Sequence, residues 1–254
     1  MRVIVTRPAN EAADWVDALR ARGFDAIAFP LIEIGPVDDP APLRRAWDEL
    51  EATCAVMFVS GNAVRHFFAQ RPKGAQWPAV TRAWATGAGT HDALKTAGIA
   101  PTLIDSPSAE SPQFDSEALW ERVSTQVRNG DVVVIVRGAD AGGEAAGRDW
   151  LAGQLSSAGA VVRTVAAYVR RAPARDRELH LAAPTTTSDG VWLFSSSQAI
   201  HNLLALDPKA DWSATRAVAT HPRIAESARS AGFGVVCESR PGLDAVIAAL
   251  ESFR

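Results

Sequence analysis

Small polar residues follow six predicted strands, at the positions where helices are expected to begin. The turns are Thr6-Arg7-Pro8, Ser60-Gly61-Asn62, Thr86-Gly87-Ala88-Gly89-Thr90, Arg137-Gly138-Ala139-Asp140, Ser195-Ser196-Ser197-Gln198 and Thr220-His221-Pro222-Arg223. The first amides and the positive dipole end of a helix attract anions. Arg7, Arg137 and Arg223 add guanidinium groups that pair with carboxylates. For any one turn, a serine, threonine or asparagine that only caps its helix is the simpler interpretation. Six such turns together predict a site for a multiply anionic small molecule.

Tyr168 is the only tyrosine of the chain. Two interpretations fit its position in a predicted strand. In one, it is a half-buried aromatic residue whose hydroxyl has a hydrogen-bond partner. In the other, its phenol donates a proton or a hydrogen bond to a leaving group. Position alone leaves both open.

The sequence lacks the common signatures of nucleotide, metal and acyl-transfer sites. It contains no GxxxxGK[ST], HExxH or GxSxG pattern. Its histidines, which are His66, His91, His180, His201 and His221, show no metal-ligand spacing. The run from Gly87 to Asp92 begins like a dinucleotide fingerprint but lacks the third glycine and the acidic partner. We therefore expect neither a metal nor another cofactor.

Short apolar runs alternate with amphipathic segments along the chain. Strands are predicted over residues 2–6, 24–34, 55–60, 81–86, 131–137, 160–170, 191–196, 215–220 and 233–239, and helices over 9–22, 62–70, 91–96, 116–127, 149–157 and 242–253. This alternation predicts parallel sheets covered by helices. Four helix ends are followed by a glycine and then an apolar strand, which makes Gly23, Gly98, Gly159 and Gly232 helix stops.

Two halves of the chain resemble one another. FVSGNAVRHFFA at 58–69 parallels FSSSQAIHNLLA at 194–205, and residues 77–98 parallel 212–232. Such repetition indicates two related α/β units. Strands run into proline-containing polar sequence near 32–42 and 165–173, which is typical of crossovers.

We predict a discontinuous α/β domain of residues 1–35 and 172–254 and a second α/β domain of residues 38–166. The crossings between them are placed at about 34–40 and 165–172. The polar turns are expected to line a cleft between the two domains, because ligands bind at the carboxyl ends of parallel strands.

Composition narrows the class of protein. The chain has 254 residues and a net charge of −3, so no basic field indicates nucleic acid or an anionic membrane. Its apolar runs are too short to span a bilayer, and no secretory signal begins it. Cys54 and Cys237 show no CxxC spacing and are expected to be buried thiols in a reducing cytoplasm.

Eight segments in a fixed order carry a resemblance to a known family. They are VTRP (5–8), FPLIEI (29–34), FVSGNAV (58–64), GAGT (87–90), FDSEAL (114–119), VVIVRG (133–138), AYVR (167–170) and HPRIAESARSAGF (221–233). In these segments, which span nearly the whole chain, it resembles the uroporphyrinogen-III synthases of tetrapyrrole biosynthesis.

The resemblance implies an α/β fold of two doubly wound parallel-sheet domains, flavodoxin-like or HemD-like, joined by a two-stranded β linker. It also implies a lyase of porphyrin and haem biosynthesis. Such an enzyme cyclises the linear octacarboxylate hydroxymethylbilane without a cofactor, inverting ring D and releasing water, to give uroporphyrinogen III. The expected protein is a cytoplasmic monomer, in transient contact with the preceding pathway enzyme.

The resemblance makes Tyr168 the catalytic residue and matches Thr90 to the family's threonine after a GxG-type turn. With the polar turns, it gives a predicted substrate-binding set of Arg7, Ser60, Gly61, Asn62, Gly87, Thr90, Arg137, Gly138, Ser195, Ser196, Ser197, Thr220, His221 and Arg223. The turn at 220–223 departs from the family pattern, and His221 would substitute there as a hydrogen-bond donor.

A noncatalytic two-lobed protein that binds a tetrapyrrole or another polyanion is the alternative, since two-lobed folds host both roles. The sequence shows neither a DNA-binding motif nor a charged tail, which disfavours a regulator.

Overall fold

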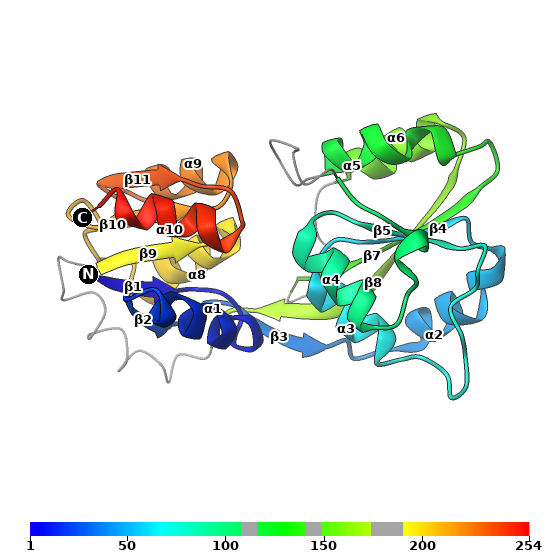
Figure 1. Ribbon diagram of the computed structural model, residues 1–254, viewed down its shortest axis with the longest axis horizontal. Helices are drawn as coiled ribbons and strands as arrows, with labels where there is room; N and C mark the ends of the chain where they lie inside the picture. Colours follow the sequence, from blue (N-terminus) through cyan, green and yellow to red (C-terminus); the bar gives the residue numbers. More distant parts are fainter. Residues whose placement is uncertain (108–115, 141–148, 174–189, 254) are drawn as a thin grey trace. The chain divides into compact units, whose positions relative to one another are not determined.

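The computed structural model of the protein describes residues 1–107, 116–140, 149–173 and 190–253. The chain forms two compact units, one of Met1–Glu33 with Arg171–Arg254 and one of Ile34–Arg170. Each unit is a sheet flanked by helices (Figure 1). None of the helices in the described part of the chain combines the length and apolar character needed to cross a membrane.

The described residues of the first unit form a parallel sheet of five strands in the order β11-β10-β9-β1-β2. The strands are β1 (Arg2–Val5), β2 (Asp25–Ala28), β9 (Gly190–Phe194), β10 (Arg216–Ala219) and β11 (Val235–Glu238), and the helices are α1 (Ala9–Ala21), α8 (Ser197–Leu206), α9 (Pro222–Ser230) and α10 (Leu243–Glu251). Counted in chain order, the sheet reads 2-1-3-4-5, which is the flavodoxin-like order. The winding reverses between β1 and β9.

Side chains of this sheet alternate between two cores. Val3 and Val5 belong to one apolar cluster, together with residues of α1 and α10. Ile4 lies in register with Trp192, which belongs to the opposite face. There the ring of Trp192 is stacked on Phe194 and meets Trp212 edge to face. Burial on both faces explains why these strands are continuous apolar runs.

In the second unit, the part of the chain that the structure describes forms six strands in the order β3-β8-β7-β4-β5-β6. The strands are β3 (Glu33–Pro36), β4 (Ala55–Phe58), β5 (Arg82–Ala85), β6 (Ile104–Asp105), β7 (Val132–Ala139) and β8 (Val161–Arg171), and the helices are α2 (Ala41–Asp48), α3 (Gly61–Phe68), α4 (Ala88–Thr96), α5 (Ser116–Val123) and α6 (Trp150–Ser157). Short 3-10 turns lie at Leu50–Ala52, Pro101–Leu103 and Ser124–Gln126. The pairs β4·β5, β4·β7, β5·β6 and β7·β8 are parallel, and the winding reverses between β4 and β7.

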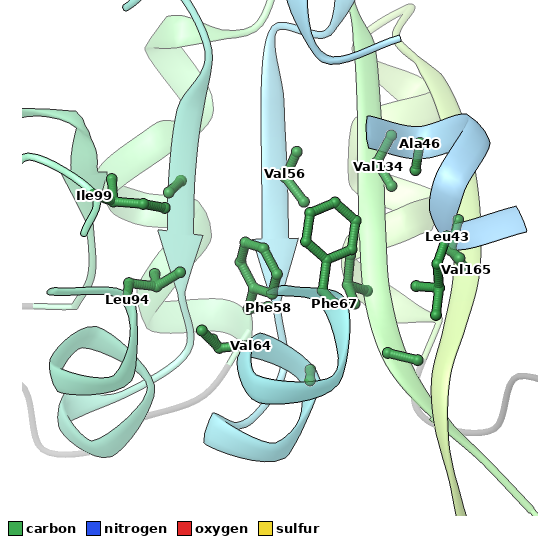
Figure 2. Close-up of a cluster of buried hydrophobic side chains, with 14 of the residues drawn as sticks. Leu43, Ala46, Val56, Phe58, Val64, Phe67, Leu94, Ile99, Val134 and Val165 are labelled. Atoms are coloured by element: carbon green, nitrogen blue, oxygen red, sulfur yellow. The ribbon is translucent and has the colours of Figure 1, made fainter. Parts of the chain in front are cut away.

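The second unit also has a core on each face of its sheet. Val56, Phe58, Val134 and Val165 point from neighbouring strands toward α2, α3 and α4, where Phe67 packs among them (Figure 2). The opposite face of the sheet is covered by α5 and α6, whose leucines contact the alternate residues of β4 and β7. The sheet is therefore doubly wound, as predicted.

Both crossings between the units are made by adjacent strands. The chain enters the second unit through β3 and leaves it through β8, and these two strands are neighbours in the sheet. Pro36 is the last residue of β3, which is an edge strand of the sheet, and edge strands tolerate proline better than central ones. The predicted fold class of two α/β domains with parallel sheets joined by two strands is confirmed.

Most local predictions hold, although the predicted elements do not include α2 and β6, and Cys54 and Cys237 are half-buried rather than buried. All four predicted glycine stops have positive φ, between 81° and 93°. The apolar run at 24–34 is not one strand but splits into β2 and β3, because Pro30 lies between them. The helix predicted over 116–127 ends at Val123 and continues as a 3-10 turn. The polar loop predicted to precede it, at 108–115, lies outside the described residues.

Candidate functional site

Four predicted site segments meet at the carboxyl edge of the second unit's sheet. Ser60 follows β4, the turn from Thr86 follows β5, Gly138 lies near the end of β7, and Tyr168 lies on β8. The strands are parallel neighbours, so their ends share one edge. The hydroxyls of Ser60 and Tyr168 lie 3.1 Å apart, although 108 positions separate the two residues.

Ser60 is the N-cap of α3. Its backbone is extended, with φ of −165°, and its Oγ accepts a hydrogen bond from the amide of Ala63 at 3.1 Å. A serine hydroxyl has one proton and two acceptor positions. The contact with Tyr168 therefore coexists with the cap, and the structural and functional interpretations of this serine are not alternatives.

Tyr168 is buried, with 4% of its surface exposed. Val165 and Ala167 of β8 belong to the core that faces α3, so strict alternation would turn Tyr168 to the other face. The register changes here, because Arg137 pairs with Ala166 whereas Gly138 pairs with Tyr168. This extra residue in β8 is a bulge, which re-aims the tyrosine into the α3 core.

His66 of α3 lies next to the tyrosine. The two ring centroids are 5.7 Å apart and the rings are tilted by 34°. Burial lowers the pKa of His66, and the charge of Arg65 lowers it further. Arg65 in turn donates to Oδ1 of Asn62 at 2.6 Å. The imidazole beside Tyr168 is therefore neutral near pH 7.

The N-terminus of α4 lies beside that of α3. A Cβ atom at Gly61 would lie 3.7 Å from the carbonyl oxygen of Gly89, in the first turn of α4. Gly87 precedes α4 and has no side chain to cap it, and Thr90 is buried in the first turn with 6% exposure. Two helix N-termini thus bring their amides and dipoles to one place.

Arg137 places a buried cation on the opposite face of β7. Its side chain is 4% exposed, and Nη1 donates to Oδ1 of Asp149 at 2.8 Å, at the start of α6. The Asp149 side chain is 79% exposed. Among the described residues, Nε of Arg137 is buried without a hydrogen-bond partner.

The first unit carries a second polar edge, where its sheet reverses direction. Thr6 and Arg7 follow β1, and Ser195 follows the neighbouring β9. Arg7 donates to Glu11 at 3.1 Å and lies 4.3 Å from the centroid of the Trp15 ring. Burial lowers the pKa of Arg7, against the opposing effect of Glu11.

Two residues of this unit's polar turns, Ser196 and His221, are N-caps of the helices that follow them. Ser196 Oγ accepts from the amide of Gln198 at 3.2 Å, and His221 Nδ1 accepts from the amide of Arg223 at 3.1 Å. Nη2 of Arg223 lies 3.4 Å from Nε2 of the same imidazole, and the role of His221 as a hydrogen-bond donor to the substrate stays a prediction. Thr220, just before it, is 7% exposed.

Helices α8 and α9 are in contact near this edge, where the hydroxyl oxygens of Ser197 and Ser227 lie 3.0 Å apart. The predicted residues thus form two groups, one on each unit. The predicted cleft between the domains stays a prediction.

Sequence reasoning missed two residues of the second unit's edge. His66 is one of the histidines without metal-ligand spacing, and it lies on the helix that Ser60 caps. Asp149 directly precedes α6, where an acidic residue is expected for electrostatic reasons alone. In the described ranges, no group of three or more histidine, cysteine or acidic side chains could hold a metal ion.

Comparisons with known proteins agree on one family. A family model described as uroporphyrinogen-III synthase HemD matches residues 13–248. The uroporphyrinogen-III synthase of Synechococcus elongatus is 30% identical over 219 residues, which are 84% of this chain and 78% of that protein. The fold of the whole chain resembles that of a mutant uroporphyrinogen III synthase from Thermus thermophilus, with a TM-score of 0.60, 18% identity and coverage of 100% of this chain and 98% of that one.

A second solved structure, uroporphyrinogen-III synthetase from Helicobacter pylori, covers 100% of both chains with a TM-score of 0.63 and 14% identity. At these identities the solved structures establish the fold, while the family model and the curated relative establish the membership. The chain belongs to the uroporphyrinogen-III synthase family.

Proposed function

We propose that the protein converts hydroxymethylbilane into uroporphyrinogen III, releasing one water and inverting ring D as the macrocycle closes. The observation that carries the proposal is the match to the family model over residues 13–248. The contact between Tyr168 and Ser60 supports it, because it brings a phenol to the edge of the sheet where α/β proteins bind ligands.

Tyr168 assists the departure of the terminal hydroxyl. Ser60 Oγ already accepts from Ala63, and its own proton can be donated to the phenol oxygen. The phenol proton is then available to the substrate. As the C–O bond breaks, its electron pair stays on the leaving oxygen, the phenol proton completes a water molecule, and an azafulvene cation remains.

Ring closure returns the proton. The cation is attacked by a ring D carbon, and a spiro intermediate leads to the inverted ring. The proton that the reacting pyrrole loses when aromaticity is restored goes back to the phenolate. Overall, hydroxymethylbilane becomes uroporphyrinogen III and water, with Tyr168 regenerated. The serine hydroxyl stabilises the phenolate by a hydrogen bond while it exists.

Substrate carboxylates are held by the polar edges of the units. In the second unit the donors are the N-termini of α3 and α4, with Arg137 on the other face of β7. In the first unit they are Arg7, the N-terminus of α8 and the turn that begins at Thr220. Such groups position a flexible octacarboxylate so that the uninverted closure is disfavoured, and orientation of this kind contributes several kcal/mol.

The identity of the product isomer tests the proposal. Freshly made hydroxymethylbilane is added to the protein, and the products are oxidised and separated by chromatography. We expect the type III isomer in excess over the type I isomer that forms spontaneously in buffer alone. Type I as the only product would reject the enzyme and favour a protein that only binds a tetrapyrrole.

We further expect a cytoplasmic monomer that meets the preceding pathway enzyme only transiently. Sedimentation of the protein alone, and with that enzyme at turnover concentrations, tests both the monomer and the transient contact. A stable dimer or a stable complex would contradict them.

A further inference from the structure

The ring of Tyr168 occupies space that a side chain at position 138 would fill. A Cβ atom built on Gly138 would lie 2.6 Å from both Cε2 and Cζ of the ring and 3.0 Å from its hydroxyl oxygen. Real Cβ contacts do not occur at 2.6 Å, so the ring or the strand would have to move. The tyrosine is 4% exposed, and a buried ring has little room to shift.

The reason for this glycine is not backbone conformation. Gly138 is absent from the glycines with positive φ, and it lies inside β7, where glycine weakens a strand relative to residues with side chains. A glycine inside a strand often marks a close approach by another group. Here that group is the phenol ring.

Three features converge on the position of the hydroxyl. The bulge between β7 and β8 turns Tyr168 toward α3, and Gly138 is the residue paired with it across the ladder. Ser60 then meets the hydroxyl at 3.1 Å. Removal of any one of the three would change where the phenol proton is presented.

We propose that Gly138 is a positioning residue of this site, which acts through Tyr168 rather than by touching the substrate. The absent side chain lets the ring pack directly against Gly138 of β7, and this position places its hydroxyl 3.1 Å from that of Ser60. This inference rests on the proposed function for its effect on turnover, but its structural part does not.

Spectroscopy tests the structural part without any activity. Because Tyr168 is the only tyrosine, protein grown with tyrosine labelled with 13C at Cζ gives one signal. We expect Gly138→Ala to move this signal, and Ser60→Ala to move it as well. Gly153→Ala is the matched control, because a Cβ at this helical position in the same unit meets nothing within 4 Å. It should leave the signal in place. An unmoved signal in Gly138→Ala would overturn the proposal.

Kinetics tests the functional part. Gly138→Ala should lower kcat by about tenfold to a hundredfold, the cost of a misplacement of roughly 1 Å. Gly153→Ala should keep the wild-type kcat. In a Tyr168→Phe background, Gly138→Ala should cause little further loss, because the hydroxyl it positions is already gone. Losses that multiply in the double variant would mean that Gly138 acts on the substrate directly, and would overturn the proposal.

If Gly138→Ala does not fold, the clash itself can be measured. The variant that combines Tyr168→Ala with Gly138→Ala lacks the ring that a Cβ would meet, so it should fold as well as Tyr168→Ala alone. A further loss of stability in this double variant would show that the ring is not the reason for the glycine. If the wild-type protein fails the isomer assay while the Cζ signal behaves as expected, the proposed function fails and the positioning role stands.

Discussion

Ser60 and Tyr168 are joined hydroxyl to hydroxyl at 3.1 Å across the carboxyl edge of one sheet. The serine comes from the start of a helix and the tyrosine from a bulged strand, so neither element alone determines the contact. The amide of Ala63 occupies one acceptor position of the serine oxygen. When the serine donates its proton to the tyrosine oxygen, the tyrosine proton is available to another acceptor.

Tyr168→Phe should lower kcat for formation of uroporphyrinogen III by about a hundredfold or more, the usual contribution of a general acid. The fold should remain, because only one hydrogen bond is lost, at a net cost of about 0.5–1.5 kcal/mol. The measurement is the initial rate of type III formation, with circular dichroism as the control for folding. A wild-type rate in this variant would remove Tyr168 from the mechanism.

Ser60→Ala should destabilise the protein more than Ser196→Ala, although both serines cap a helix at equivalent places of the repeat. Loss of either cap costs about 1 kcal/mol. Ser60→Ala also leaves the buried Tyr168 hydroxyl without this partner, which adds about 1–3 kcal/mol.

Hydrogen exchange measured separately in each unit compares the two variants. Equal losses would mean that the Tyr168 contact contributes nothing to stability.

Much of this architecture follows from local sequence. The alternation of apolar runs and amphipathic helices predicts parallel doubly wound sheets, and the repeat of Ser60 at Ser196 predicts paired helix starts. These predictions succeed because each feature has a local sequence pattern. A strand buried on both faces is a continuous apolar run, and a helix that ends in the left-handed conformation is followed by glycine. The boundary between β2 and β3 at Pro30 could not be predicted from hydrophobicity, because the apolar residues continue across it.

The contacts of the site could not be derived in the same way. Nothing near Tyr168 in the chain indicates that a bulge turns its ring, since a bulge appears only when two strands are paired. Likewise, Gly138 reads as one more turn glycine until the ring beside it is seen. The ion pair of Arg137 depends on how α6 is docked on the sheet.

Arg137→Gln should raise KM by about tenfold or more, because a charge-assisted hydrogen bond to a substrate carboxylate is worth about 1.5–3 kcal/mol. Asp149→Asn should lower KM, since the exposed Asp149 carboxylate competes with the substrate for the same guanidinium. Steady-state kinetics with hydroxymethylbilane measures both effects.

Arg82→Gln is the matched control. Arg82 also pairs with a carboxylate, that of Asp105 at 2.7 Å, but it lies at the amino end of β5. Its loss should reduce stability and leave KM unchanged. A raised KM in Asp149→Asn would instead mean that the ion pair between Arg137 and Asp149 serves to hold α6 on the sheet.

The unfolding free energy should fall as the pH drops below about 6.5, and His66 should account for part of this slope. Burial, and then the charge of Arg65, lower the pKa of His66 in the folded protein below its ordinary value of 6.5. Between those two values the unfolded chain binds a proton that the folded chain does not, so acidification favours unfolding.

Urea unfolding at a series of pH values, from about one unit above to about one and a half units below the ordinary histidine pKa, measures the slope. His66→Gln should flatten the profile below pH 6.5, because the group that titrates differently in the two states has been removed. His201→Gln changes an exposed side chain of α8 and is the matched control, which should keep the wild-type profile. Parallel profiles for the wild type and His66→Gln would show that burial and Arg65 do not lower the pKa of His66 in the folded protein.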